Sequence, residues 1–119
     1  GIGIDKSPAD TRRTPKVQIT ENIIKFGPVK HNAPQQQRTF TLTNTGDGEL
    51  IVRAVETGGK VATTLMPGQR IPAGSSFTAK ATLDPGRQEY GVVTDFVTII
   101  TNDPTRPMRR LRATAIVED

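Results

Sequence analysis

Residue types that carry much of protein chemistry are missing or scarce in this 119-residue chain. It contains no cysteine, no tryptophan, one tyrosine (Tyr90) and one histidine (His31). The absence of thiols excludes cysteine nucleophiles, zinc fingers, iron–sulfur clusters and disulfide scaffolds. A transition-metal site would have a single imidazole and no thiolate, which is too few ligands for tight binding. We therefore expect neither a metal nor any other cofactor.

Long apolar runs and targeting signals are also absent. No stretch approaches the roughly 18 consecutive apolar residues of a membrane-spanning helix, so no membrane span is expected. No charged start leads into the apolar run of a signal peptide. Residues 1–15 combine Gly, Asp, Ser, Pro and Thr with charged side chains and show no apolar period. We expect residues 1–15 to form a linker and residues 16–119 to form one domain of a longer protein.

The abundant residues favour strands. Thr (17), Ile (10) and Val (9) make up 36 of the 119 residues, and β-branched side chains suit a pleated surface. Alternating apolar and polar segments predict strands over residues 16–20, 23–26, 38–44, 49–55, 61–65, 75–83, 92–101 and 108–117. No segment shows a helical period. The pattern predicts an all-β chain, an immunoglobulin-like antiparallel β-sandwich of seven to eight strands.

Turns and core follow from the same alternation. Turns are expected at Gly27-Pro28, over residues 44–48, over residues 66–74, at Asp84-Pro85-Gly86 and at Asn102-Asp103-Pro104, because these residue types favour turn conformations. The predicted core consists of Phe26, Phe40, Leu42, Leu50, Val52, Phe77, Leu83, Val97, Ile99, Leu111 and Ala113.

The order of several short motifs is similar to that of a known family. These motifs are Phe26-Gly27-Pro28-Val29, residues 40–46, Leu50-Ile51-Val52, Pro72-Ala73-Gly74, residues 98–103 and residues 111–117. Over residues 22–117 the chain resembles the immunoglobulin-like domains of unknown function that are common in exported Bacteroidetes proteins, which are similar to Hydin-type and major-sperm-protein-type sandwiches. The resemblance implies the fold and a periplasmic or cell-surface location. Its motifs mostly shape turns, so it implies no specific activity.

One motif of that family is missing. Family members often carry a Cys-Gly-Cys-Thr run after the third strand, whereas residues 57–63 here read TGGKVAT. Any thiol or metal chemistry of that run therefore does not extend to this chain.

No set of side chains has the arrangement of a catalytic site. His31 stands alone in a polar loop, where a surface role is expected. The serines are Ser7, Ser75 and Ser76, and none lies in a G-x-S-x-G elbow or beside a base. The scattered carboxylates, mostly in expected turns, are Asp84, Glu89, Asp95 and Asp103. Calcium-loop spacing and a phosphate loop leading into a helix are both absent. We expect no enzyme.

The basic excess of the chain is modest. Lys and Arg number 16 and Asp and Glu 12, for a formal charge of +4, and Arg109, Arg110 and Arg112 lie together on the last expected strand. A basic strand can contact phosphates, but binders of single strands add stacking aromatics, and Phe is mostly assigned to the core here. Charged strands also keep sheets from aggregating. We therefore do not expect nucleic acid as the partner.

These observations favour a non-catalytic immunoglobulin-like module of a larger exported bacterial protein. It would serve protein–protein contact or spacing, with a neighbouring domain or another protein as partner and no small-molecule substrate. One alternative is a carbohydrate or surface-adhesion module. Such modules usually expose aromatic side chains to sugar rings, and this chain has one tyrosine, Tyr90, and no tryptophan, which counts against this alternative. The less favoured alternative is a nucleic-acid-contacting domain, which would bind with a steep salt dependence.

The alternation also predicts a contact face. If Val97 and Ile99 point inward, as the family's strand pattern suggests, Phe96 and Ile100 point outward. The same argument applies to the last strand and the third strand, which lie beside this one in immunoglobulin sandwiches. The predicted face consists of Ile51, Arg53, Phe96, Ile100, Met108, Arg110 and Arg112. Aromatic residues, Met and Arg are enriched at protein interfaces. The alternative is a shifted phase, in which Phe96 belongs to the core.

Overall fold

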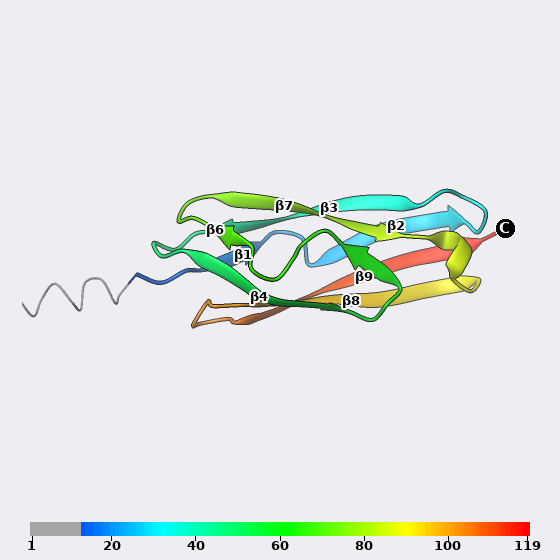
Figure 1. Cartoon of the computed structure of the whole chain (residues 1–119). Helices are drawn as coiled ribbons and strands as arrows, with labels where there is room; N and C mark the ends of the chain where they lie inside the picture. The colour runs from blue at the N-terminus through cyan, green and yellow to red at the C-terminus, as the bar shows by residue number, and fades with distance from the viewer. Residues whose placement is uncertain (1–12) are drawn as a thin grey trace, which may run out of the picture.

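Nine strands form two sheets that lie face to face (Figure 1). The computed structural model describes residues 13–119. The four-stranded sheet has the order β1 (Val17–Ile19), β3 (Gln36–Asn44), β7 (Ser76–Leu83), β5 (Val61–Thr63). The five-stranded sheet has the order β2 (Ile23–Lys30), β9 (Met108–Glu118), β8 (Gly91–Thr101), β4 (Leu50–Thr57), β6 (Arg70–Ile71).

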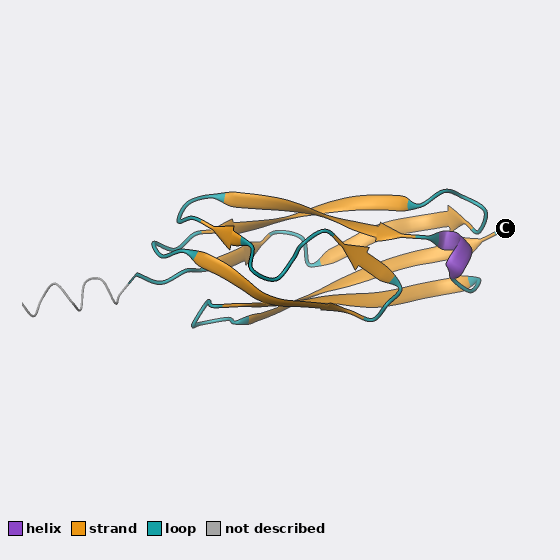
Figure 2. Ribbon diagram, viewed as in Figure 1, coloured by secondary structure: helices purple, strands orange, loops and turns teal. Residues whose placement is uncertain are grey.

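Helix is limited, in the described part of the chain, to a 3₁₀ turn at Pro85–Arg87, drawn in purple in Figure 2. No helix within residues 13–119 has the length and apolar character needed to cross a membrane. The predicted all-β, immunoglobulin-like sandwich is confirmed, with nine strands instead of seven to eight.

Alternation along the strands builds the core between the sheets. On β8, Val97 and Ile99 are fully buried, whereas Phe96 points outward. Ten of the eleven predicted core residues are buried. The exception is Phe77, which is half-buried because its part of β7 extends beyond β5, and β5 pairs only with residues 81–83. Each fully buried Leu, Ile or Phe side chain contributes about 1.5–3 kcal/mol, so this core is the main force that holds the sheets together.

The turn expected at Gly27-Pro28 is wrong, because both residues lie inside β2. Gly27 has a φ of 72°, which suits glycine, and the register with β9 shifts between Lys25 and Gly27, which is a β-bulge. Pro28 has no N–H group, but β2 is the edge of its sheet, so a missing donor is tolerated there. The Gly-Pro pair therefore marks a bulge in an edge strand and not the end of the strand.

Two pairings differ from the expected pattern of strands. β6 lies within residues 66–74, which were expected to be a turn, and it pairs with the start of β4. β2 pairs with β9 in parallel, whereas the other strand pairs of the described residues are antiparallel. The parallel pair arises because the chain crosses between the sheets after β1, which itself pairs with β3.

Two residues before the expected domain start at residue 16 contact the sandwich. Residues 1–12 of the expected linker lie outside the described residues, but Thr14 is bound to the loop after β3. Its N–H donates to Asp47 Oδ1 (2.8 Å), and its carbonyl accepts from the N–H groups of Asp47 (3.1 Å) and Gly48 (3.2 Å). Pro15 is buried. Thr14 and Pro15 therefore pack against the sandwich, and the domain start at residue 16 stays a prediction.

A buried asparagine holds the same loop from within. Asn44 has no exposed surface, and its Nδ2 donates to the carbonyls of Gly48 (2.7 Å) and Ile71 (2.9 Å). Its Oδ1 accepts from the N–H groups of Lys16 (3.2 Å) and Gly46 (3.0 Å). The side chain uses its full capacity of two donors and two acceptor sites. The predicted turn after β3 is therefore built around this one amide, which also fixes the start of β1 and the end of β6.

Replacing Asn44 by alanine removes the partner of two N–H groups and two carbonyls. Because a buried unsatisfied polar group costs about 1–3 kcal/mol, we expect Asn44→Ala to lower the free energy of unfolding by roughly 2–4 kcal/mol in urea denaturation. Asn32→Ala, in an exposed loop, is the matched control and should change it by less than about 0.5 kcal/mol. Equal stability of the two variants would contradict the role assigned to Asn44.

Candidate contact surface

The residues of the predicted contact face lie on three adjacent strands, β9, β8 and β4 (Figure 1). In the ladder between β8 and β9, Phe96 lies opposite Arg112, and Ile100 lies opposite Met108. The odd-numbered residues of β8 from Val93 onward point into the core, so Phe96 and Ile100 point away from it. We call the following outward side chains the Phe96 face: Ile51, Arg53, Phe96, Ile100, Met108, Arg110 and Arg112.

Two residues of β4 at or beside a bulge belong to this face. The ladder between β4 and β8 shifts its register between Val52 and Ala54. Val52 is fully buried, whereas Ile51 is half-buried and Arg53 is exposed. Ile51 and Arg53 therefore flank a core residue and point to the outer side of the sheet.

Phe96 lies at one end of this face, beside two arginines of β9. Its side chain is 39% exposed, and the guanidinium carbon of Arg110 lies 5.4 Å from the ring centroid. This distance is within the roughly 6 Å range of cation–π attraction. Arg112 is the directly opposite residue on β9. The phase that would place Phe96 in the core is not the one adopted; the contact role of the face stays a prediction.

Three exposed apolar residues, Ile23, Val92 and Ile116, extend this surface and were not part of the predicted face. Val92 and Ile116 lie opposite each other on β8 and β9. They follow the same alternation as Phe96 and Arg112, so the period-two pattern contained the signal for them. Ile23 lies opposite Arg112 on β2, and it could be found only by knowing that β2 pairs with β9 in parallel.

The outer face of the four-stranded sheet has a different character. We call its outward side chains on β3 and β7 the threonine face: Thr39, Thr41, Thr43, Ser76, Thr78 and Lys80. Hydroxyl groups pair across the strands, with Thr41 and Thr78 3.1 Å apart and Thr43 and Ser76 2.9 Å apart.

Exposed large apolar side chains are concentrated on one sheet. Residues 13–119 have seven of them: Ile23, Met66, Tyr90, Val92, Phe96, Met108 and Ile116. Met66 and Tyr90 lie in loops, and the other five lie on the outer side of the five-stranded sheet. The threonine face has none. The two outer surfaces of the sandwich therefore differ sharply in chemistry.

The side chains weighed as catalytic candidates are not brought together. His31 stacks on Tyr90 with the ring centroids 4.7 Å apart, beside the 3₁₀ turn. Ser75 and Ser76 lie at the opposite end of β7, and Ser7 is outside the described residues. Within residues 13–119, no three His, Asp or Glu side chains are grouped as metal ligands would be.

Asp95, one of the four carboxylates, has a structural role that sequence reasoning missed. It lies inside β8 and not in a turn. Its two carboxylate oxygens accept from the N–H groups of Gly58 (2.9 Å), Lys60 (3.0 Å) and Val61 (2.9 Å). This buried carboxylate therefore holds the turn between β4 and β5 against β8. No signal in the sequence marks such a contact, because the partners are backbone groups more than 30 residues away.

Asp103, in the expected turn after β8, is buried and binds three N–H groups. Val17 donates to it over 2.9 Å, Thr105 over 2.8 Å and Arg106 over 3.2 Å. Burial alone would raise the pKa of Asp103, but these donors, together with the charge of Lys16, hold the pKa below its ordinary value. The carboxylate therefore ties β1 to the turn between β8 and β9.

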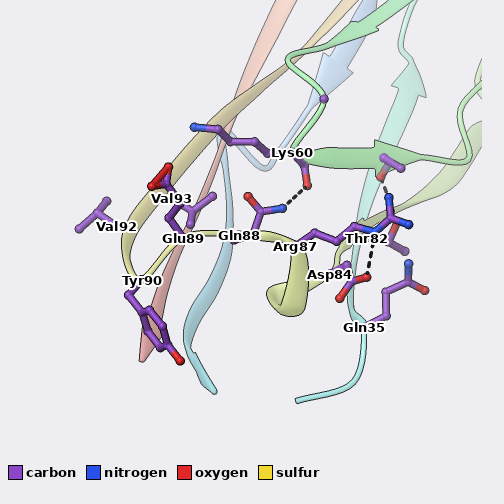
Figure 3. A pocket seen from close by; sticks show the side chains of 12 residues that line it. Gln35, Lys60, Thr82, Asp84, Arg87, Gln88, Glu89, Tyr90, Val92 and Val93 are labelled. Carbon is purple, nitrogen blue, oxygen red and sulfur yellow. Dashed lines mark hydrogen bonds and ion pairs between the residues drawn. The ribbon is translucent and has the colours of Figure 1, made fainter. Parts of the chain in front are cut away.

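A polar hollow of about 770 Å³ lies at the end of the sandwich that carries the 3₁₀ turn (Figure 3). Its polar lining consists of Gln35, Lys60, Thr82, Asp84, Arg87, Gln88, Glu89 and Tyr90. Some of these residues already interact with one another. Arg87 Nε lies 3.6 Å from Asp84 Oδ2, and Gln88 Nε2 donates to the Lys60 carbonyl (3.4 Å). The volume is in the range of small-molecule sites, but the lining is polar and largely exposed.

The strand order and the crossing between sheets define an immunoglobulin-like β-sandwich. The family model described as "Protein of unknown function (DUF1573)" matches residues 17–117, so the chain belongs to this family. None of the curated proteins compared with the chain matches it.

Solved structures with the same fold come from distant proteins. A protein of unknown function from Porphyromonas gingivalis W83 is 20% identical, with a TM-score of 0.77 over 87% of this chain and 47% of that one. PapD-like domain 7 of human CEP192 is 14% identical, with a TM-score of 0.67 over 89% and 87%. The chaperone–tip adhesion subunit pre-assembly complex CsuC–CsuE of Acinetobacter baumannii matches at 12% identity, with a TM-score of 0.60 over 87% and 57%. The chain thus spans about half the length of the Porphyromonas chain, and these similarities establish the fold.

The carboxylate of Asp103 makes stability depend on pH. Because its pKa is lower in the folded state than the ordinary 3.8, it stabilises the fold above about pH 4, and this contribution is lost as the pH falls through the folded pKa. We expect Asp103→Asn to lower the free energy of unfolding by about 1–3 kcal/mol at neutral pH and by clearly less near pH 2, in urea denaturation.

The matched control for this prediction is Glu56→Gln, which changes an exposed carboxylate without hydrogen bonds in the described structure. Its free energy of unfolding should differ little from that of the parent chain at either pH. If Asp103→Asn lowered the free energy of unfolding by the same amount at both pH values, the charge of Asp103 would not be what stabilises the fold.

Proposed function

We propose that the chain is a non-catalytic module of a larger exported bacterial protein and that it makes protein contacts through the Phe96 face. The observation that carries this proposal is the contrast between the two outer surfaces. Five exposed large apolar side chains lie on one sheet and none on the threonine face. An exposed group of apolar side chains on one face usually marks a contact site.

The composition of the Phe96 face supports a protein partner. Phe, Met and Arg are enriched at protein interfaces relative to the rest of the surface, and Arg and aromatic residues often dominate binding energy. Phe96 is held in place by Arg110, so part of its conformational freedom is already lost before a partner binds.

The comparisons support the setting of this proposal. The family and the Porphyromonas protein are both described as of unknown function, and a fold neighbour is a chaperone in complex with a tip adhesion subunit. A periplasmic or cell-surface location, with a neighbouring domain or a separate protein as partner, agrees with these similarities.

An adhesion module that binds carbohydrate is the second candidate. The polar hollow and its bordering Tyr90 ring favour it, since saccharide sites combine polar side chains with an aromatic ring. One side of that ring is already stacked on His31. A carbohydrate role would make the hollow, and not the Phe96 face, the surface that binds.

Photo-cross-linking in the producing cells tests the proposed function. With the photoreactive residue benzoylphenylalanine at position 96, we expect one discrete protein adduct, or a cross-link to a neighbouring domain of the same protein. The matched control carries benzoylphenylalanine at position 78 on the threonine face, where no adduct is expected. Equal cross-linking from both positions, or none from position 96, would refute the proposal.

The stability of Phe96→Ser shows whether this site is a surface site, as the proposal requires. A core phenylalanine truncated this far costs about 3–5 kcal/mol, whereas this exposed one should cost about 1 kcal/mol or less. The free energy of unfolding from urea denaturation separates the two. Phe40→Ser, at a fully buried position, gives the size of the core effect.

A further inference from the structure

The arginines of the Phe96 face have no acidic partner in the described structure. The two ion pairs formed by residues 13–119 lie elsewhere, one at β6 and one at the 3₁₀ turn. Arg53, Arg110 and Arg112 are exposed and take part in neither. Arg110 packs on the Phe96 ring instead. Among the described residues, these guanidinium groups therefore have no carboxylate partner.

Carboxylates are sparse on the outer side of the five-stranded sheet. Its outward positions add Lys25 and Lys30 on β2 to the three arginines, and the acidic side chains there are Glu56 on β4 and Glu118 near the end of β9. The centre of the face is therefore basic as well as apolar. The planar fork of an arginine pairs best with a carboxylate or a phosphate, to which it can make two parallel hydrogen bonds.

We propose that the Phe96 face binds an acidic protein segment, one that presents carboxylates on either side of an apolar centre. The carboxylates pair with Arg110 and Arg112 on β9, and the apolar centre packs on Phe96 beside them. Ile23, across Arg112 on β2, and Ile100, four residues farther along β8, add apolar contact on either side. This inference rests on the proposed function and names the chemistry of the partner.

A second copy of this chain does not fit the face. In a two-fold symmetric pair the same patch meets itself, so its excess of basic over acidic side chains would be doubled in the interface. The chain as a whole also carries a formal charge of +4. Like charges brought together at an interface are costly, so charge complementarity requires a different and acidic partner.

Nucleic acid and an anionic membrane fit less well than a protein. A single-strand binder stacks successive bases on several aromatic rings, but among residues 13–119 this face carries one, Phe96. Ile23, Ile100 and Met108 have no partner on a phosphodiester chain. These apolar side chains also lie among arginines on the surface of a sheet, and do not form the apolar side of an amphipathic helix that enters a bilayer.

A pair of synthetic peptides tests the proposal. One has two central leucines flanked on both sides by glutamates, and the other has glutamine in place of each glutamate. They are titrated into the ¹⁵N-labelled chain and followed by NMR. We expect the glutamate peptide to shift amide signals around Phe96 and Arg112, to bind at least about tenfold more tightly than the glutamine peptide, and to weaken as salt is added.

Substitutions locate the effect. The double variant Arg110→Gln/Arg112→Gln should bind the glutamate peptide about tenfold more weakly, and Arg53→Gln should also weaken it. Lys80→Gln removes a charge of the same sign from the threonine face and should leave the affinity unchanged. Retention of affinity by the double variant, with its folding verified by urea denaturation, would overturn the proposal.

Other outcomes also decide it. Equal binding of the two peptides, or signal shifts on the threonine face, would overturn the acidic partner. The proposal would also be overturned if duplex DNA or phosphatidylserine vesicles bound more tightly than the glutamate peptide and lost affinity in the same arginine variants. If neither peptide binds while the cross-link from position 96 persists, the acidic chemistry is wrong and the protein contact stands. Loss of the cross-link would remove the contact itself.

Discussion

The register between β8 and β9 is the constraint on which the rest of this domain depends. Ten consecutive positions pair, from Gly91 with Val117 to Ile100 with Met108. A slip of one residue would turn Phe96 into the core and expose Val97, because side chains alternate with a period of two. Two buried carboxylates act near this ladder: Asp103 holds the turn that joins the strands, and Asp95 attaches the turn after β4 to β8. The register between β8 and β9 therefore decides both which side chains form the core and which form the outer surface.

The same alternation explains how much could be predicted from the residues alone. β7, β8 and β9 are long uninterrupted runs with apolar side chains at most alternate positions, so their extent and the burial of Val97, Ile99 and Leu111 follow directly. In β8 the polar Asp95 and Thr101 also take inward positions. β6 has two residues, too few for a period to show. β2 contains Gly27-Pro28, a pair that usually breaks strands and is tolerated here only because β2 lies at a sheet edge.

Features that depend on contacts between distant residues could not be predicted from the sequence. The parallel pairing of β2 with β9 brings Ile23 beside Arg112, and nothing near Ile23 in the chain indicates it. Asp103 looks like an ordinary turn residue, yet it binds the N–H of Val17, 86 positions away. The outward direction of the Phe96 face follows from local alternation. Its full extent, and the lack of a carboxylate partner for its arginines within residues 13–119, could be seen only from the sheet order and the contacts. Local periodicity thus predicts which side chains point outward, whereas the residues that surround them are known only from the tertiary structure.

Met108 and Met66 allow the most direct test of the claim that a partner covers the Phe96 face. Both side chains are exposed in this domain, at 54% and 63%, but Met108 lies on the face and Met66 in the loop between β5 and β6. Dilute peroxide should oxidise both to the sulfoxide at similar rates in the isolated chain, as measured by mass spectrometry of the digested protein. In cells that produce the protein in its native setting, we expect Met108 to be protected at least about fivefold while Met66 stays reactive. Equal oxidation of the two residues in that setting would contradict the account.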